Sequence, residues 1–219
     1  MDTLVDIFNE HHIHEGLFAI EGKQMPVDTY ESLCDTLDEN FDFTSVNFAK
    51  LRAVKREDEL ELLRIAANIG DESFAALLPQ LKVGMTENEV RIILETEMLK
   101  RGSEEPSFAT IIASGSRSSM PHGVASDKVI EAGDFVTIDF GSVYKGYHSD
   151  MTRTIVMGPA SDLQKKLYSI VLEAQKRGVA AVRAGITGKE LDAVCRDYIK
   201  EHGYTKEFNH GTGHGLGLE

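Results

Sequence analysis

The residues best suited to chemistry in this chain are two aspartates and a pair of histidines. Asp139 lies in the apolar run FVTIDFG, and Asp150 lies in the polar segment SDMTRT. His210 and His214 lie four residues apart in the glycine-rich segment NHGTGHGLGLE. Carboxylate oxygens, supplemented by imidazole nitrogen, are ligands of hard and borderline divalent cations. These residue types indicate a metal site if the fold brings them together.

The sequence around the aspartates suggests how they would meet. Residues 134–158 are expected to form two β-strands joined by a short connection that contains Gly146. Paired strands would bring Asp139 and Asp150 to one place, and an ionised carboxylate among Val, Ile and Phe is costly unless it is paired or metal-bound. The glycines beside His214 permit close approach of its backbone to a site. We therefore interpret Asp139, Asp150 and His214 as candidate metal ligands.

Each of these residues also has a simpler explanation. Asp139 alone would be explained by a buried salt bridge, for example with Arg153, and HGTGHG alone by a tight loop with incidental histidines. His122 lies in the polar loop SGSRSSMPHGVAS, where it is either an ordinary exposed histidine or a functional one that titrates near neutrality. No role is expected for the remaining histidines, His11, His12, His14, His148 and His202.

Hydrophobic periodicity predicts the elements that would position these residues. Residues 17–22 are expected to form a short strand, residues 27–40 a helix, and the apolar stripe from Leu60 to Leu81 one long helix. A lone strand cannot pair its own edge. Residues 1–50 therefore look like a small α/β piece that either packs against something else or is the remnant of a larger domain.

An internal repeat organises the rest of the chain. The segment VGMTENEVRIILETEMLKRG (83–102) resembles AGITGKELDAVCRDYIKEHG (184–203) at an offset of 101 residues. Each copy has a T-x-x-E capping box and a terminal glycine. We interpret this as a duplicated helix–helix–strand unit. The strands of the second copy would extend past the last residue, so we expect the sequence to be part of a longer protein.

Composition excludes several classes of function. Hydrophobic residues make up 42% of the 219, enough for a core, and 36 acidic against 23 basic residues argue against nucleic-acid binding. No run approaches 18 apolar residues, and the first residues lack the basic and apolar regions of a signal peptide. We expect no membrane span and a cytoplasmic protein. Cys34 and Cys195 are expected to be buried thiols rather than a disulfide.

Four ordered motifs resemble those of the pita-bread metallopeptidases, which include Xaa-Pro dipeptidases (prolidases), Xaa-Pro aminopeptidases and methionine aminopeptidases. The motifs are PHG at 121–123, TIDFG at 137–141, SDMTRT at 149–154 and HGTGHGLGL at 210–218. The resemblance covers residues 55–219 and implies an α+β pita-bread catalytic domain of two pseudo-symmetric halves, incomplete at its C-terminus. Residues 1–54 resemble the end of the N-terminal α/β domain of the Xaa-Pro enzymes and creatinase, which favours those enzymes over methionine aminopeptidase.

The resemblance also implies roles for individual residues. Asp139, Asp150 and His214 would be metal ligands, with Asp150 bridging two divalent ions. His122 would contact the substrate or the tetrahedral intermediate, and His210 would line the pocket. The ions would be manganese, with cobalt or zinc as alternatives. Further ligands of the family, two glutamates, would follow Glu219, so we expect residues 1–219 alone to bind metal weakly and to be inactive.

The activity implied by the resemblance is hydrolysis of the peptide bond before a proline in the second position of a small peptide. Water activated by the two metal ions would attack the carbonyl. Homodimers are common in the family, and the sequence leaves the oligomeric state open, as it does the choice between dipeptidase and aminopeptidase. The alternatives are a non-catalytic peptide- or protein-binding member of the fold and a metal-free creatinase-like hydrolase. The presence of all three candidate ligands argues against both.

Overall fold

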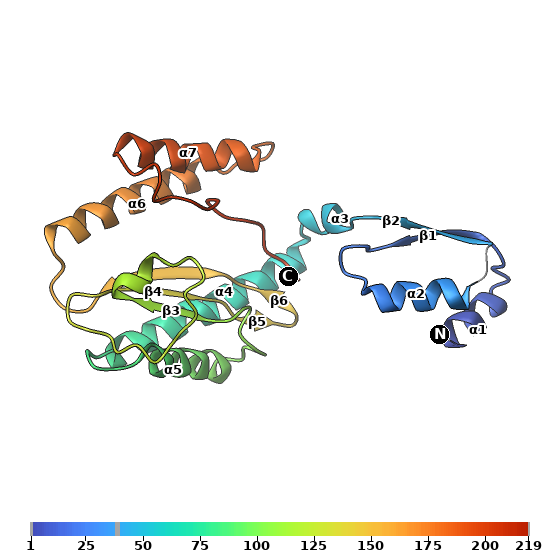
Figure 1. Cartoon of the computed structure of the whole chain (residues 1–219), viewed down its shortest axis with the longest axis horizontal. Helices are drawn as coiled ribbons and strands as arrows, with labels where there is room; N and C mark the ends of the chain where they lie inside the picture. The colour runs from blue at the N-terminus through green and yellow to red at the C-terminus, as the bar shows by residue number, and fades with distance from the viewer. Residues whose placement is uncertain (1, 38–39, 219) are drawn as a thin grey trace. The chain divides into compact units, whose positions relative to one another are not determined.

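The computed structural model describes residues 2–37 and 40–218, and the chain divides into two compact units, Met1–Lys55 and Arg56–Glu219 (Figure 1). Among the described residues, no helix combines the length and the apolar character needed to cross a bilayer. The assignment of the first unit to a larger N-terminal domain stays a prediction.

The first unit is a small α/β arrangement. Its elements are α1 (Asp2–Glu10), β1 (Gly16–Ile20), α2 (Val27–Thr36), β2 (Phe41–Ser45) and α3 (Ala49–Ala53). The strand expected at 17–22 is β1, and it pairs in parallel with β2, which the sequence analysis missed. Parallel strands need a crossover between them, and α2 provides it. The rings of Phe8, Phe18 and Phe41 pack beside the sheet.

The helix expected over residues 27–40 is shorter than predicted. It ends at Thr36 because Leu37 is extended, with φ −98° and ψ 131°. Positions 38 and 39 lie outside the described residues. Helix α2 contains no buried residue, so the expectation that Cys34 is buried is wrong. Cys195 is buried as expected, and both thiols are free.

The main core of the second unit lies between two helices and a three-stranded antiparallel sheet of order β3–β4–β7. The elements are α4 (Glu57–Leu77), followed by the 3₁₀ turn η1 (Leu78–Gln80), α5 (Glu87–Lys100), β3 (Ile111–Ser114), β4 (Phe135–Phe140) and β7 (Met151–Val156). Val136, Ile138 and Phe140 of β4 meet Leu77 of α4 and Leu94 of α5 in this core. Helix α4 is the long helix expected from the apolar stripe. Figure 1 shows α4 and α5 on one side of the sheet.

The two strands expected within residues 134–158 are each broken in two. Between β4 and β7 lie β5 (Val143–Tyr144) and β6 (Tyr147–His148), joined by a turn in which Gly146 has φ +77°. At the break the backbone passes close to itself at Gly141, where an added Cβ would overlap the carbonyl oxygen of Ser149. The hydroxyl of Ser149 accepts a 2.9 Å hydrogen bond from the amide of Ser142. This bond joins the segment between β4 and β5 to the segment between β6 and β7.

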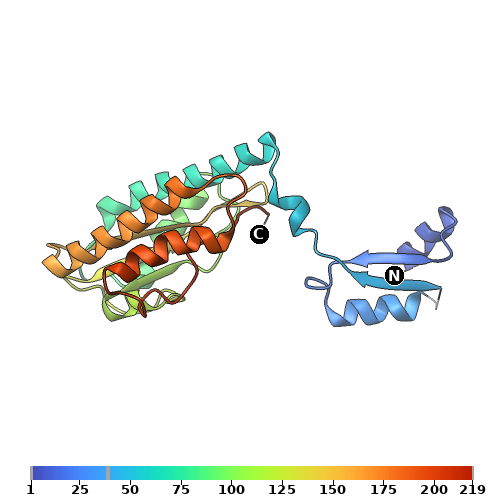
Figure 2. The ribbon, with the colours of Figure 1, turned by 90° about the horizontal axis from the view of Figure 1, so that it is seen from above.

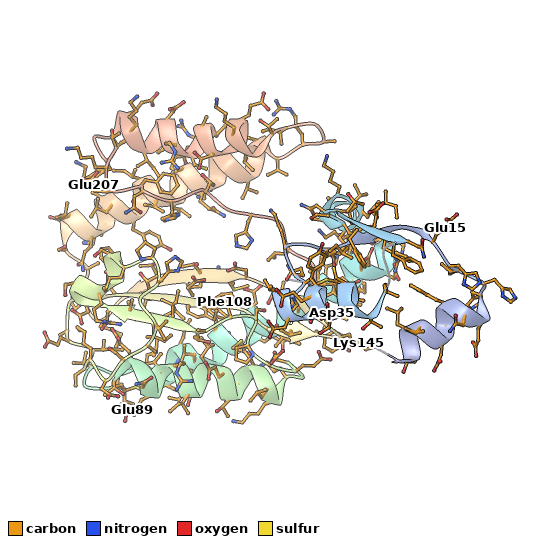
Figure 3. The ribbon with its side chains drawn as sticks, turned by 45° about the vertical axis from the view of Figure 1, so that its right-hand side comes forward. Glu15, Asp35, Glu89, Phe108, Lys145 and Glu207 are labelled. Carbon is orange, nitrogen blue, oxygen red and sulfur yellow. The ribbon has the colours of Figure 1, made fainter. Side chains whose placement is uncertain are left out.

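The internal repeat is confirmed as far as its helices extend. Helix α7 (Gly188–Glu201) has the same length as α5, 14 residues, and begins and ends 101 positions later. Both capping boxes form, and Gly102 and Gly203 have φ near +98° and +92°. Helix α6 (Asp162–Ala181) runs beside α7 (Figure 2) and shares with it a smaller core that contains Ile170, Ala174, Cys195 and Ile199. Figure 3 places Glu89 of α5 and Glu207, which follows α7, on opposite sides of the sheet.

Candidate metal centre

Asp139 lies on the face of β4 that is turned away from the core. Val136, Ile138 and Phe140 are buried, and the alternation of a strand places Asp139 on the opposite face. Its partner in the ladder is Thr152 of β7, whose hydroxyl donates a 2.9 Å hydrogen bond to Asp139 Oδ1. Arg153 faces Ile138 in the register and forms its ion pair with Asp71 instead, at 3.1 Å. The simpler explanation of Asp139 as the partner of Arg153 is therefore wrong.

Asp150 and His214 are in direct contact. Asp150 directly precedes β7 and is two residues from Thr152, so it lies further along the face that carries Asp139. The Nε2 atom of His214 is 3.1 Å from Oδ2 of Asp150. The Nδ1 atom of His214 is 2.9 Å from the carbonyl oxygen of Gly215, which can only accept, so this contact calls for a proton on Nδ1. The other ring nitrogen of His214, Nε2, faces the Asp150 carboxylate.

The pKa of the Asp139 carboxyl reports on what surrounds it. Burial raises the pKa, the nearby Asp150 carboxylate raises it further, and the Thr152 hydrogen bond together with His214 and His122 opposes the rise. The net shift is upward from 3.8. Side chains from four segments, carrying Asp139, Asp150, His214 and His122, are therefore close enough to influence this carboxyl group.

The chemistry of these donors fits a divalent cation. Two carboxylates and an imidazole Nε2 that faces one of them form an oxygen-rich donor set, and a shared cation would offset the repulsion between the carboxylates. Across residues 2–37 and 40–218, no group of three or more His, Cys, Asp or Glu side chains is gathered closely enough to hold a metal ion. The assignment of Asp139, Asp150 and His214 as ligands stays a prediction.

The loop that carries His122 is fastened by a buried carboxylate. Glu87, at the start of α5, is fully buried and accepts hydrogen bonds from the amide and hydroxyl of Ser114 at 2.8 and 2.9 Å. It also accepts from the amide and hydroxyl of Ser126 at 3.1 and 2.6 Å and pairs with Arg117 at 3.1 Å. These contacts hold the loop at positions before and after the exposed His122. The loop includes the 3₁₀ turn η2 (Gly115–Ser119).

The segment after α7 carries His210 and His214 and runs back toward β5 and β6 (Figure 1). The His210 ring packs edge-on against Phe208, with centroids 5.0 Å apart, and its Nδ1 lies 2.8 Å from the carbonyl oxygen of Gly211. At the far end, the amide of His148 in β6 donates a 2.8 Å hydrogen bond to Gly217. This bond holds the end of the histidine segment against His148, which lies two residues before Asp150 in the chain.

Residues 61–219 match the family described as metallopeptidase family M24. The chain belongs to metallopeptidase family M24. It is 50% identical over 169 residues to the Xaa-Pro dipeptidase of Pyrococcus furiosus, a match that covers 77% of this chain and 49% of that protein. The M24 chain spans about half the length of the curated relatives it matches.

Solved structures show the M24 fold. The Xaa-Pro dipeptidase from Bacillus anthracis superposes with a TM-score of 0.93 at 47% identity, over 100% of this chain and 61% of that one. The X-Pro aminopeptidase from Thermotoga maritima superposes with a TM-score of 0.91 at 40% identity, over 100% of this chain and 62% of that one. The mixed α/β second unit is therefore a pita-bread-type M24 domain, as the motifs indicated.

Several residues that organise the site were missed by the sequence analysis. Glu87 is the first residue of a capped helix, where an acid is ordinarily explained by the helix dipole. Asp192 and Arg196 of α7 bind the histidine segment, and their only signal was an acid–base pair four residues apart. Such pairs are common on helix surfaces, so the spacing alone did not distinguish them.

Proposed function

We propose that the whole M24 protein is a metal-dependent exopeptidase that hydrolyses the bond between an N-terminal residue and proline. The observation that carries this proposal is the contact between His214 Nε2 and Asp150 Oδ2, with Asp139 on the same face of the sheet. Family membership supports a metallopeptidase. The proline specificity rests on relatives named as Xaa-Pro dipeptidases and an X-Pro aminopeptidase.

Asp139, Asp150 and His214 would hold the divalent metal. Bound divalent ions would supply a water of lowered pKa and would polarise the scissile carbonyl. The oxygen-rich donor set favours manganese, and cobalt and zinc are the alternatives.

The remaining residues of the site would act on the substrate itself. His122, on the loop fastened by Glu87, would donate a hydrogen bond to the oxygen that becomes negatively charged as the carbonyl is attacked. His210, held edge-on against Phe208, would line the pocket beside the substrate. His214 would keep its proton on Nδ1, through Gly215, so that Nε2 stays available to the metal.

We also propose a small peptide with proline in its second position as the substrate, and a cytoplasmic location, which is consistent with two free thiols. Residues 1–219 alone would bind metal weakly and would not turn over peptide, because they supply only three of the ligands that the family resemblance implies.

The proposal is tested first on the protein as its cells make it. The intact mass shows whether residues 1–219 are the whole polypeptide, and hydrolysis of Ala-Pro with Mn²⁺ is then compared with hydrolysis of Ala-Gly. We expect Ala-Pro to be cleaved only with metal, and Asp150→Asn to abolish cleavage. Peptide binding without cleavage of Ala-Pro would refute the enzymatic proposal and favour a binding protein on the same fold.

A further inference from the structure

Two side chains of α7, Asp192 and Arg196, hold the segment that carries the candidate site histidines. Asp192 Oδ1 accepts hydrogen bonds from the amide and the hydroxyl of Thr212, both at 2.9 Å. Arg196 donates from Nη1 to the carbonyl of Phe208 and from Nη2 to the carbonyl of His210, both at 2.7 Å. Residues 208, 210 and 212 are thus all tied to one turn of a helix.

The two helix residues also stabilise each other and the rings beside them. Arg196 Nε is 2.6 Å from Asp192 Oδ2, and Nη2 is 3.1 Å from Oδ1, so the pair is bidentate. The Arg196 guanidinium lies 4.4 Å from the centre of the Phe208 ring, against which the His210 ring packs at an angle of 80°. Both the backbone and the ring of His210 are therefore connected to Arg196.

The internal repeat offers a matched comparison. At the offset of 101 residues, Asp192 and Arg196 correspond to Arg91 and Glu95 of α5, the same positions with the charges exchanged. Arg91 Nη1 binds Glu95 Oε2 at 2.7 Å, and Arg91 Nε lies 3.4 Å from Asn88 Oδ1, so these contacts stay within α5. In α7 the equivalent pair also donates to or accepts from residues that lie 12 to 20 positions later in the chain.

We infer that Asp192 and Arg196 are positioning residues for the candidate metal centre, which hold segment 208–212 so that His214 meets Asp150 before metal binds. The inference rests on the proposed function, because that function gives His214 its role. The segment from 210 to 217 contains four glycines, and glycine loses the most conformational freedom when it is ordered. A segment fastened in advance leaves less of that entropy to be lost when the metal binds.

The carboxylate of this pair is ionised over the whole useful pH range. Arg196 lowers the pKa of Asp192 to about 2, chiefly through its hydrogen bonds, and Thr212 adds to the effect. The pair therefore holds the segment at any pH at which the protein is folded, rather than acting as a switch.

The test compares variants in α7 with matched variants in α5, all in the whole protein as its cells make it. Asp192→Asn removes the charge and one accepting oxygen. Arg196→Lys keeps the charge but loses the planar guanidinium, whose separate nitrogens reach Asp192 and the two carbonyls. Glu95→Gln and Arg91→Lys are the controls, because they weaken an equivalent helix pair that does not bind the segment. Thermal unfolding shows whether each variant is folded. If Asp192→Asn does not fold, Arg196→Lys still tests the inference.

The first measurement is amide hydrogen exchange of residues 208–218 without metal. We expect exchange at least tenfold faster in the α7 variants and unchanged in the α5 controls. The second is affinity for Mn²⁺ alone, from the free-ion electron paramagnetic resonance signal, which we expect to weaken about tenfold in the α7 variants, as for other residues that orient a ligand.

The outcomes separate the inference from the proposed function. Unchanged exchange in both α7 variants would show that the pair does not hold the segment. Faster exchange with unaltered Mn²⁺ affinity would show that it holds the segment without positioning His214. If the unsubstituted whole protein does not bind Mn²⁺, the candidate metal centre is wrong, and the exchange rates alone decide whether the pair fastens the segment.

Discussion

At the scale of single residues, strand alternation separates Asp139 from the apolar side chains that flank it in the sequence. Ile138 and Phe140 are fully buried against the helices, whereas Asp139 faces Thr152 on the other side of β4. The carboxylate is still desolvated enough for its pKa to rise, so it avoids the core without gaining full hydration. Its position fits a ligand better than it fits a structural ion pair.

Gly141 is the residue whose replacement should disturb this arrangement most. An alanine Cβ at Gly141 would overlap the backbone carbonyl of Ser149, which cannot move aside without displacing Asp150. We expect Gly141→Ala to lower the free energy of unfolding by about 2–3 kcal/mol, the upper range for overpacking. Urea denaturation followed by circular dichroism measures this.

The control for that substitution is Gly188→Ala at the start of α7. A Cβ there has open space around it, so this variant should be neutral or slightly stabilising, by about 0.5 kcal/mol. Equal destabilisation by the two variants would mean that the close approach at Gly141 is not what matters.

At the scale of elements, the start of α5 does more than begin a helix. Glu87 joins that helix to both ends of the loop around His122 through Ser114, Arg117 and Ser126. Burial by itself raises the pKa of Glu87, but the hydrogen bonds from Ser126 and Ser114 and the charge of Arg117 outweigh it, and the pKa falls below 4.5. The loop is therefore organised around an ionised carboxylate.

The lowered pKa of Glu87 predicts a pH dependence of stability. Because the folded state holds the proton less tightly than the unfolded state, this contribution is complete above 4.5 and is lost as the pH falls through the lower folded value. Glu87→Gln should lower the free energy of unfolding at pH 7 by about 3–5 kcal/mol, since Arg117 loses its partner. Its stability should also fall less steeply below pH 4.5 than that of the unsubstituted protein.

Urea titrations between pH 7 and pH 3 measure both effects. Glu89→Gln is the control, because Gln preserves the capping box of the same helix and the change should be small. Parallel pH profiles for Glu87→Gln and the unsubstituted protein would contradict the prediction.

At the scale of the whole molecule, the two units differ in how much apolar surface they bury. Among the described residues of the first unit, Leu37 is the one buried hydrophobic side chain, at 7% exposure. The second unit has a large core beneath its sheet and a smaller one between α6 and α7. Since apolar burial is the main stabilising contribution, the first unit should be the less stable.

We expect the first unit to open at lower urea concentration than the second. Hydrogen exchange with mass spectrometry at increasing urea should show peptides from 16–53 losing protection before peptides from 57–100. Peptides from α6 and α7 serve as an internal reference for the smaller core. Simultaneous loss of protection throughout the chain would show that the two units unfold as one.

The sequence by itself determined the local features of this protein. Two capping boxes with αL glycines after them, the long helix α4 and the four ordered motifs were all legible, because capping, periodicity and turn chemistry depend on residues a few positions apart. The family and its pita-bread-type domain followed from the motifs and are confirmed.

Only the tertiary structure decided which distant residues meet. The pairing of β1 with β2, the five hydrogen-bond donors around Glu87 and the reach of Asp192 to Thr212 join segments 20 or more residues apart. No local pattern encodes these contacts, because an acid on a helix looks the same whether it faces water or a returning chain. The path of the backbone selects the partner, and burial then makes that partner necessary.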